Sequence, residues 1–457
     1  MSRRYPRLGA RRERVVGWLL LALLLAVTGL AVSIWRPLAP RVPASGGELS
    51  AFSASVLDTV RAYRTPRYVV AALATAASVA VPLVFVVTRW GRRRIAVWAG
   101  GGGGALRGGL VALRLSVLSS LAVLPLAVYV GIVHDGRWGF RTRSVGGWFS
   151  DWFLRSAGHW LLVSVLVAAL LAAMRRWPSS WPYRATVGGT VLVAAFVLLH
   201  PLVVQPLFLP TTPLADGPDR EAVEEVLARA GASDLDVRIG QASLRSTRVN
   251  ALVTGLGPTE RIVIYDNLLE LPREQIAAVV AHELAHHEHA DLPRGVALSA
   301  AALLAGLLVV HLVTASRSAQ AAMGARGPAD PRMVAVILAA AAVLELVGTP
   351  IGNLVSRRAE AAADARAVEL TRDPAHLLAT TRVFTVRDLS APEPPSWIRL
   401  LYGSHPTVAE RIDYLDGWAR QHGVDLPSVT ELQEAERDQH HPAIADGPPR
   451  QPGGARP

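Results

Sequence analysis

The sequence lacks two residue types altogether, cysteine and lysine. Without cysteine there is no disulfide framework and no thiolate ligand, so a bound metal would have to use histidine and carboxylate groups. Without lysine, all 47 basic residues are arginine. Since the arginine side chain keeps its proton near neutrality, the net charge of +11 persists there.

Charged residues are also scarce, at 18% of the chain against 51% hydrophobic residues. This balance, with a mean hydropathy of +0.31, argues against an ordinary soluble globular protein. Seven apolar runs are each close to the ~20 residues that cross a bilayer as a helix. These runs are Val15–Trp35, Tyr68–Thr88, Leu115–Val133, Ser156–Met174, Ala185–Val204, Gly295–Ser316 and Met333–Ser356.

The arginines flank these runs, so contact with lipid headgroups explains the basic charge better than nucleic acid does. The first run could be a cleaved signal peptide, because Arg3 and Arg4 precede it, but its length favours a retained span. Glu345 lies near the middle of the last run. Because a carboxylate is costly in hydrocarbon, we expect Glu345 to face protein or a water-filled cavity.

Two polar segments interrupt or follow the runs, and the first contains short alternating stretches that predict strands at Val237–Ile239, Val249–Thr254 and Arg261–Tyr265. The last 34 residues are rich in Pro, Gly, Gln and Asp, which predicts disorder. The predicted organisation is a basic N-terminus (1–14), a five-helix membrane region (15–207), a first catalytic part (208–292), two further spans (293–356), a second catalytic part (357–423) and a disordered tail (424–457).

The candidate chemistry is concentrated in Ile276–Leu292, IAAVVAHELAHHEHADL, which contains the pattern HExxH. The stretch is predicted to be a helix that Pro293 ends. Residues four apart share a helix face, so His282 and His286 can present two imidazoles to one metal ion. Glu283 beside them can hold the attacking water and take its proton.

Patterns as short as HExxH also arise by chance, and a polar helix face rich in histidine is the alternative. Apolar residues such as Ile276, Val280 and Leu284 favour a partly buried helix instead, because a surface histidine cluster is not expected in so apolar a segment.

A catalytic zinc site takes three protein ligands and leaves one position open. The best candidate for the third ligand is Glu360, in NLVSRRAEAAAD at Asn353–Asp364. Asp364 lies one turn further on the same predicted helix, where it could accept the free N–H of a ligating histidine and orient the ring. The alternative is a solvated helix face in which the two carboxylates pair with Arg357 and Arg366.

His405 precedes the capping-box pattern TVAE at Thr407–Glu410, which predicts the start of a last helix. A histidine at such a helix mouth could hydrogen-bond the oxyanion of a tetrahedral intermediate. On the residues alone, a histidine in an ordinary turn is an equal alternative.

Three segments are similar to the signatures of the type I CAAX prenyl protease family: HELAH at His282–His286, SRRAEAAAD at Ser356–Asp364 and SHPTVAERI at Ser404–Ile412. The stretch at Val249–Leu269 also resembles the family, as does the loop GFRTRSVGGWFSDW, and the resemblance extends to about Gly423. It implies a mainly α, multi-spanning membrane protein. Seven transmembrane helices would surround a water-filled chamber, and a gluzincin-type α+β metallopeptidase domain would carry a small sheet.

The resemblance implies that His282, His286 and Glu360 bind one zinc ion. Glu283 would be the general base, and Asp364 would be the carboxylate partner of a zinc-ligating histidine. His405, at the mouth of the last predicted helix, would stabilise the transition state.

The resemblance places Asn250 on an edge strand that pairs with the extended substrate backbone. Asn353 and Arg411 would support the site structure. The expected function is therefore that of a membrane-embedded zinc metalloendopeptidase, located in the cell membrane as a multi-pass protein. Its expected partners are the lipid bilayer and a peptide or protein substrate, membrane-associated or lipidated, and not nucleic acid.

Several alternatives stay open. The Arg-only, Ala-rich composition is typical of a high-GC bacterium, where membrane quality control or peptide processing is as reasonable a role as CAAX processing. A stress-response protease of the same clan commonly has four spans, fewer than predicted here. A non-catalytic scaffold or transporter would need a fourth structural ligand, for which His289 is better placed than His287.

The side of the membrane that carries the site also stays open. The arginine distribution favours a cytoplasmic N-terminus, which with seven spans would place the site outside. The family arrangement places it on the cytoplasmic side.

Overall fold

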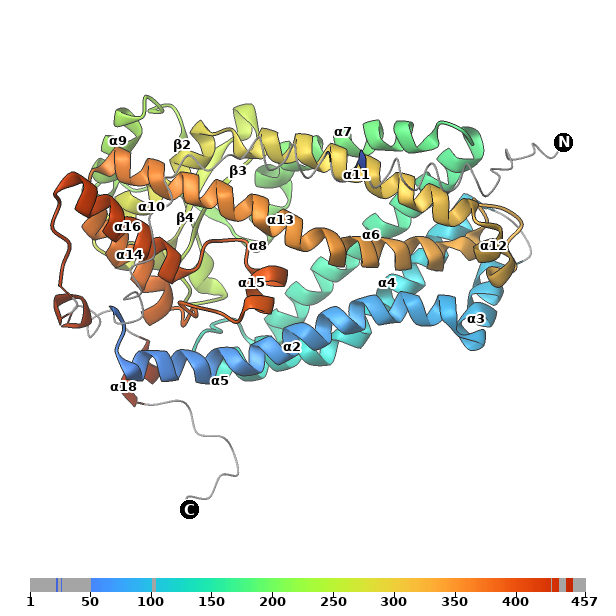
Figure 1. The fold of residues 1–457 in the computed structure, drawn as a ribbon, viewed down its shortest axis with the longest axis horizontal. Coiled ribbons are helices and arrows are strands. Elements are labelled where there is room, and N and C mark those ends of the chain that lie inside the picture. Colours follow the sequence, from blue (N-terminus) through green and yellow to red (C-terminus); the bar gives the residue numbers. More distant parts are fainter. Residues whose placement is uncertain are drawn as a thin grey trace, which may run out of the picture.

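The structure is a computed structural model, and it describes residues 22, 23, 26, 51–100, 104–428, 430–434 and 441–446. Long helices dominate it, with a small sheet at one end (Figure 1). Within the described residues, six helices are long and apolar enough to cross a membrane. The first of the seven predicted spans, Val15–Trp35, lies outside the described residues apart from three isolated positions.

The six candidate spans match the other six apolar runs. They are α2 (Ala54–Val87), α4 (Ala105–Val128) with the helical turns that continue it through η2 (Tyr129–His134) and α5 (Asp135–Arg137), α6 (Val145–Arg176), α7 (Trp181–Val203), α11 (Asp291–Ala315) and α13 (Val334–Thr371) with the turn η6 (Pro331–Met333) before it.

The remaining helices are shorter and mostly belong to the polar segments. They are α3 (Arg89–Ala99), α8 (Gln205–Phe208), α9 (Pro218–Arg229), η3 (Ala242–Leu244), η4 (Gly257–Thr259), η5 (Asp266–Glu270), α10 (Arg273–Glu288), α12 (Arg317–Met323), α14 (Pro374–Val386), α15 (Ser396–Tyr402), α16 (Val408–His422) and α18 (Pro442–Asp446).

Helix α13 passes without a break through the boundary predicted at residues 356 and 357, between the last span and the second polar segment. Its 38 residues contain a proline, Pro350, but that residue does not end the helix. The alanine-rich sequence after the span has high helix propensity and no stop signal before Thr371. The membrane part and the part that carries Glu360 are therefore one continuous rod.

A four-stranded sheet lies beside α10, with the strand order β1-β2-β4-β3. Its strands are β1 (Thr211–Pro213), β2 (Asp236–Gly240), β3 (Ala251–Thr254) and β4 (Arg261–Tyr265). The central pair, β2 and β4, is parallel, and both outer pairs are antiparallel. In β4, Ile262, Val263 and Ile264 are fully buried, so the sheet packs on both faces there. Strand β3 is an edge of the sheet, and no other strand of the described residues pairs with its outer side.

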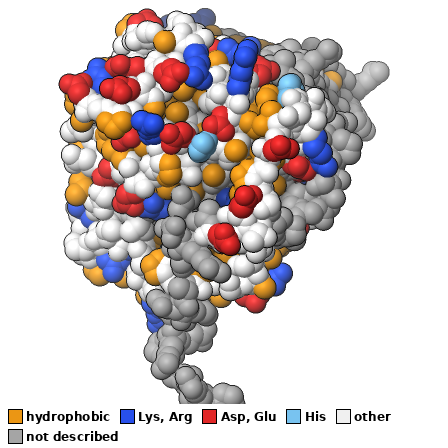
Figure 2. Space-filling view, turned by 90° about the vertical axis from the view of Figure 1, so that its left-hand side faces the viewer, with side chains coloured by type: hydrophobic (Ala, Val, Ile, Leu, Met, Phe, Trp, Pro, Cys, Tyr) orange, Lys and Arg blue, Asp and Glu red, His pale blue; other side chains and the backbone are white. Residues whose placement is uncertain are grey.

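The two ends of the molecule differ in their surfaces. The end that carries the sheet, at the left of Figure 1, faces the viewer in Figure 2, where acidic and basic side chains are interspersed among apolar ones. The large exposed apolar side chains lie mostly on the candidate spans. The surface chemistry therefore places the sheet end in water and the long helices in the bilayer.

Glu345 on α13 lines a cavity of about 650 Å³ that α2, α4 and α6 also border. His159 and several serines, among them Ser116 and Ser120, line the same cavity. Glu345 is exposed and borders this cavity, where water would hydrate its carboxylate, in agreement with the prediction.

The tail from residue 424 onward was predicted to be disordered, but those of its residues that the structure describes include ordered, buried ones. Residues 442–446 form helix α18, and Leu432 is buried in the core. His441 is also buried, and its ring centroid lies 4.8 Å from that of Phe140. The backbone N–H of His441 donates to the Val386 carbonyl, 2.8 Å away. Apolar contacts made by a few residues stabilise this order, which a polar composition does not reveal.

Candidate metal centre

Helix α10 holds the HExxH pattern, and its burial follows from its apolar residues. Ile276, Val280 and Leu284 are fully buried in the core beneath the sheet. The helix ends at Glu288, because Ala290 adopts a left-handed conformation (φ 53°) that turns the chain into α11. The prediction that Pro293 ends this helix is wrong, since Pro293 lies in the first turn of α11, where proline is tolerated.

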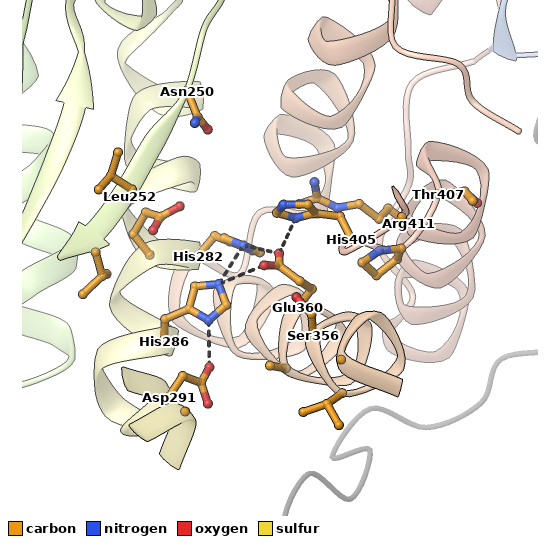
Figure 3. Close-up of a pocket in the computed structure, with 18 of the residues that line it drawn as sticks. Asn250, Leu252, His282, His286, Asp291, Ser356, Glu360, His405, Thr407 and Arg411 are labelled. Atoms are coloured by element: carbon orange, nitrogen blue, oxygen red, sulfur yellow. Dashed lines mark hydrogen bonds and ion pairs between the residues drawn. The ribbon is translucent and has the colours of Figure 1, made fainter. Parts of the chain in front are cut away.

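Three side chains converge between α10 and α13, namely His282, His286 and Glu360 (Figure 3). One ligand atom of each lies within 4.8 Å of the others. The His282 Nε2 atom lies 3.2 Å from Glu360 Oε2 and 3.3 Å from His286 Nε2. Two imidazoles and one carboxylate make a donor set that suits zinc and needs no thiolate.

Each of the two imidazoles has a carboxylate at its other nitrogen. His282 Nδ1 lies 2.9 Å from Asp364 Oδ1, as the sequence predicted for one of the histidines. His286 Nδ1 lies 2.8 Å from Asp291 Oδ2. Carboxylates in this position fix the tautomer and the ring orientation, which leaves both Nε2 atoms facing Glu360.

Sequence reasoning missed Asp291. It lies five residues after His286, so helix periodicity does not place it beside that ring. The left-handed turn at Ala290 brings it back. The sequence gives one indication of Asp291: it is an acidic residue at the start of the next apolar run. An acidic residue also stabilises a helix N-terminus, so this position did not point to the metal site.

The electrostatics of the cluster favour a cation. Burial alone would lower the pKa of His282, but the carboxylates of Asp364 and Glu360 outweigh burial and raise that pKa to about 10. The cluster therefore attracts positive charge, as a metal site must.

Glu283 lines the cavity that adjoins the cluster. Burial raises the pKa of Glu283, while the neighbouring His282 and His286 oppose that shift. The backbone of Val253 in β3 hydrogen-bonds the Glu283 carboxylate. A carboxylate whose pKa is raised toward neutrality is a better proton acceptor at working pH.

His405 also reaches the cluster, with its Nδ1 atom 2.9 Å from Glu360 Oε2. It lies just before α16, whose first turn has the predicted capping box. The Thr407 hydroxyl accepts from the Glu410 N–H, and the Glu410 carboxylate accepts from the Thr407 N–H. The imidazole is 64% exposed, so it borders open space.

Arg411 and Asn353 lie around the cluster in supporting positions. Arg411 donates to Asp364 Oδ1 at 2.5 Å, which extends the chain of contacts from His282. Asn353 is further away, and its side-chain amide donates to the Leu400 carbonyl of α15 at 3.0 Å. Asn353 thus ties α15 to α13 and does not reach the three converging groups.

Asn250 immediately precedes the free edge of the sheet. Its carbonyl accepts from the Tyr265 N–H at 2.9 Å, so the β3–β4 pairing already begins there. The cavity is lined by Asn250, Ala251, Leu252 and Val253 on this side and by the metal-site side chains on the other. Figure 3 shows Asn250 and Leu252 beside the cluster, across from Glu360.

The arrangement does not favour a closed four-ligand site. His287 turns away to pair with Glu260, at 2.9 Å between Nδ1 and Oε1. Among the described residues, the group of possible ligand side chains contains neither His287 nor His289.

Comparison with known proteins yields two family matches in tandem. The family described as CAAX prenyl protease N-terminal, five membrane helices, matches residues 42–209. Peptidase family M48 matches residues 216–419, which include all the residues of the cluster.

Relatives and one solved structure agree with these matches. The chain is 25% identical over 326 residues to the uncharacterized metalloprotease YhfN of Bacillus subtilis, covering 71% of this chain and 74% of that one. It is 28% identical over 314 residues to the CAAX prenyl protease 1 homolog of Oryza sativa, covering 66% and 71% respectively. The crystal structure of S. mikatae Ste24p shares the fold with a TM-score of 0.72 at 22% identity, covering 88% of this chain and 99% of that one.

Proposed function

The chain belongs to peptidase family M48 and is a multi-pass membrane metalloendopeptidase, and on that premise we propose that His282, His286 and Glu360 hold one catalytic zinc ion. The observation that carries the proposal is the convergence of these three side chains from α10 and α13 at the wall of a large cavity. The free edge of β3 borders the same cavity. A metal site next to a vacant strand edge is what cleavage of an extended peptide requires.

When bound, zinc would polarise the scissile carbonyl and lower the pKa of water toward ~7. Glu283 accepts the proton of the attacking water and passes it to the leaving amine. His405 donates a hydrogen bond to the oxyanion. Asp364 and Asp291 hold the two imidazoles in the orientation that directs their Nε2 atoms at the ion.

The substrate backbone pairs with β3. The backbone groups of Ala251 and Val253 alternate with those that bond to β4. The Val253 N–H already donates to Glu283, so the N–H and carbonyl of Ala251 and the carbonyl of Val253 are the groups available to a peptide in the cavity. Asn250 flanks the start of this edge. We propose membrane-associated peptides or proteins as substrates, and the relatives named CAAX prenyl protease make lipidated peptides one class to assay.

The mechanism predicts that Glu283→Gln keeps its metal and loses peptide cleavage by about 10²-fold or more, because the amide cannot take a proton. Metal analysis of the purified protein and a peptide-cleavage assay with and without chelator measure the two properties. Glu288→Gln, on the same helix but in an exposed pair with Arg366, is the matched control. Full activity of Glu283→Gln would overturn the mechanism, and absence of metal from the active wild type would overturn the zinc site.

A further inference from the structure

The cavity at the metal cluster continues into the membrane region. Its volume is about 1010 Å³, and it extends between α11 and α13 from Gly295 to Gly306 on one helix and from Val355 to Leu344 on the other. We call this part the intramembrane groove. Leu344 and Glu360 lie on the same helix 16 positions apart, which is roughly 24 Å at the rise of an α-helix. An extended peptide of about seven residues spans that distance.

At three positions in the groove, close packing against a neighbour does not explain why the residue is glycine. A Cβ atom added at Gly295, Gly348 or Gly352 would meet no heavy atom within 4 Å. Some other glycines of the spans permit close helix contact, since a Cβ at Gly108 or Gly189 would lie 2.1 Å or 2.5 Å from a neighbouring leucine, whereas Gly158 and Gly188 face open space on the outer surface. In the groove, the missing side chains instead leave space open.

The groove also changes in polarity along its length. The metal end carries the histidines, acidic groups and Arg411, whereas between Leu298 and Gly306 and between Leu344 and Val355 the described lining residues are all uncharged. A charged group placed there would lose hydration without gaining a partner. The groove therefore suits an apolar occupant.

We propose that the intramembrane groove takes an extended, unmodified apolar segment of the substrate polypeptide, on one side of the scissile bond. This proposal rests on the proposed function. A polypeptide is favoured because the groove is continuous with the free edge of β3, where a main chain would already be extended. Gly348 and Gly352 set specificity, because they leave room for the substrate side chains beyond the metal.

The test uses purified full-length enzyme with two unmodified peptides: a short one that spans only the β3 edge, and a long one that adds six apolar residues. Profiling the cleavage products identifies the side of the bond on which the added residues lie. The wild type is expected to prefer the long peptide. Gly352→Leu and Gly348→Leu should lower kcat/KM for the long peptide about tenfold or more. They should change kcat/KM for the short peptide by no more than about twofold, because the leucine side chains occupy only the groove and not the β3 edge.

Gly188→Leu is the matched control. Gly188 lies on the exposed face of α7, a Cβ there meets nothing within 4 Å, and the residue lines neither cavity described above. Replacing one residue of the added segment by Asp should likewise lower cleavage of the long peptide.

Equal losses on both peptides, or no loss on either, would overturn the groove proposal while leaving the peptidase intact. In a third assay, the long peptide carries a prenyl or acyl chain. If Gly348→Leu and Gly352→Leu lowered cleavage of this lipidated peptide alone, the proposal would also be overturned, since the occupant would then be the lipid. Failure of the proposed function gives a different result: the wild type would cleave neither peptide.

Discussion

At the scale of the residue, the site consists of two nearly equivalent halves. Each imidazole of the HExxH pattern has its Nδ1 atom against a carboxylate, Asp364 for His282 and Asp291 for His286. The two carboxylates come from different helices, α13 and α11, so the orientation of the pair depends on both. The ligands themselves are thus only part of what a metal site needs.

We expect Asp364→Asn and Asp291→Asn each to lower zinc affinity about 10- to 100-fold, because an amide no longer holds the ring nitrogen as strongly. Competition with a chromogenic chelator measures the affinity. Asp58→Asn, in an exposed pair with Arg61 that does not line the cavity, is the control. If only Asp364→Asn weakened binding, Asp291 would have no part in orienting His286.

Asp388, in the loop after α14, is a buried carboxyl outside the proposed machinery. Burial raises its pKa to about 6, although Arg248 and the backbone of Val249 lower it. The folded protein therefore holds this proton more tightly than the unfolded chain does. Its ionisation in the folded state costs stability, and the cost grows as pH rises toward the folded pKa and is complete above it.

Asp388→Asn cannot ionise, so its free energy of unfolding should fall less than that of the wild type as pH rises from about 4 to about 7, by up to roughly 3 kcal/mol. Denaturant unfolding at several pH values in one detergent measures the difference. The surface variant Asp416→Asn should follow the wild type. Parallel curves for Asp388→Asn and the wild type would contradict the assignment.

At the scale of the element, the edge strand and the HExxH helix act together. The Val253 backbone N–H donates to the Glu283 carboxylate, so β3 positions the proposed base and offers the remaining groups of its edge to a peptide. Because only alternate amides of an edge strand point outward, pairing with a substrate has a two-residue period.

A series of substrate peptides, each N-methylated at one amide, should therefore show alternating losses of kcat/KM. Methylation of an amide that donates to β3 removes that hydrogen bond and is expected to cost about tenfold, as for an interaction of 1–1.5 kcal/mol, whereas the intervening positions should be tolerated. A uniform loss along the peptide would argue against strand pairing.

At the scale of the whole molecule, the cluster joins segments that are far apart in the chain. His282 and Glu360 are 78 residues apart, with α11 between them as one candidate span. A metal ion held by α10 and α13 would tie the sheet end to the long membrane helix. Ligand binding to the folded state alone raises stability by mass action.

Chelation should therefore lower the Tm of the detergent-solubilised wild type. If free zinc is present at about 100 to 1,000 times its Kd, its removal lowers the free energy of unfolding by about 3–4 kcal/mol. Glu360→Gln should start from a lower Tm and respond little to chelator. Differential scanning measurements at fixed protein concentration give both values. An equal response of this variant and the wild type would mean that the stabilising ion sits elsewhere.

The sequence by itself determined those features that depend on local order. Hydropathy located the six described spans, because bilayer crossing needs only a sufficiently long apolar run. Helical spacing placed His282 and His286 on one face, and the capping box at Thr407 located the start of α16, because both depend on residues within one or two turns.

The tertiary structure alone decided the rest. The sequence pattern made Glu360 a candidate ligand, but the contact between Glu360 and His282 depends on how α10 packs against α13. The left-handed turn that returns Asp291 to His286 and the groove between α11 and α13 depend on packing as well. Contacts of this kind join residues with no local relation in the chain, so only the packed arrangement of the helices specifies them.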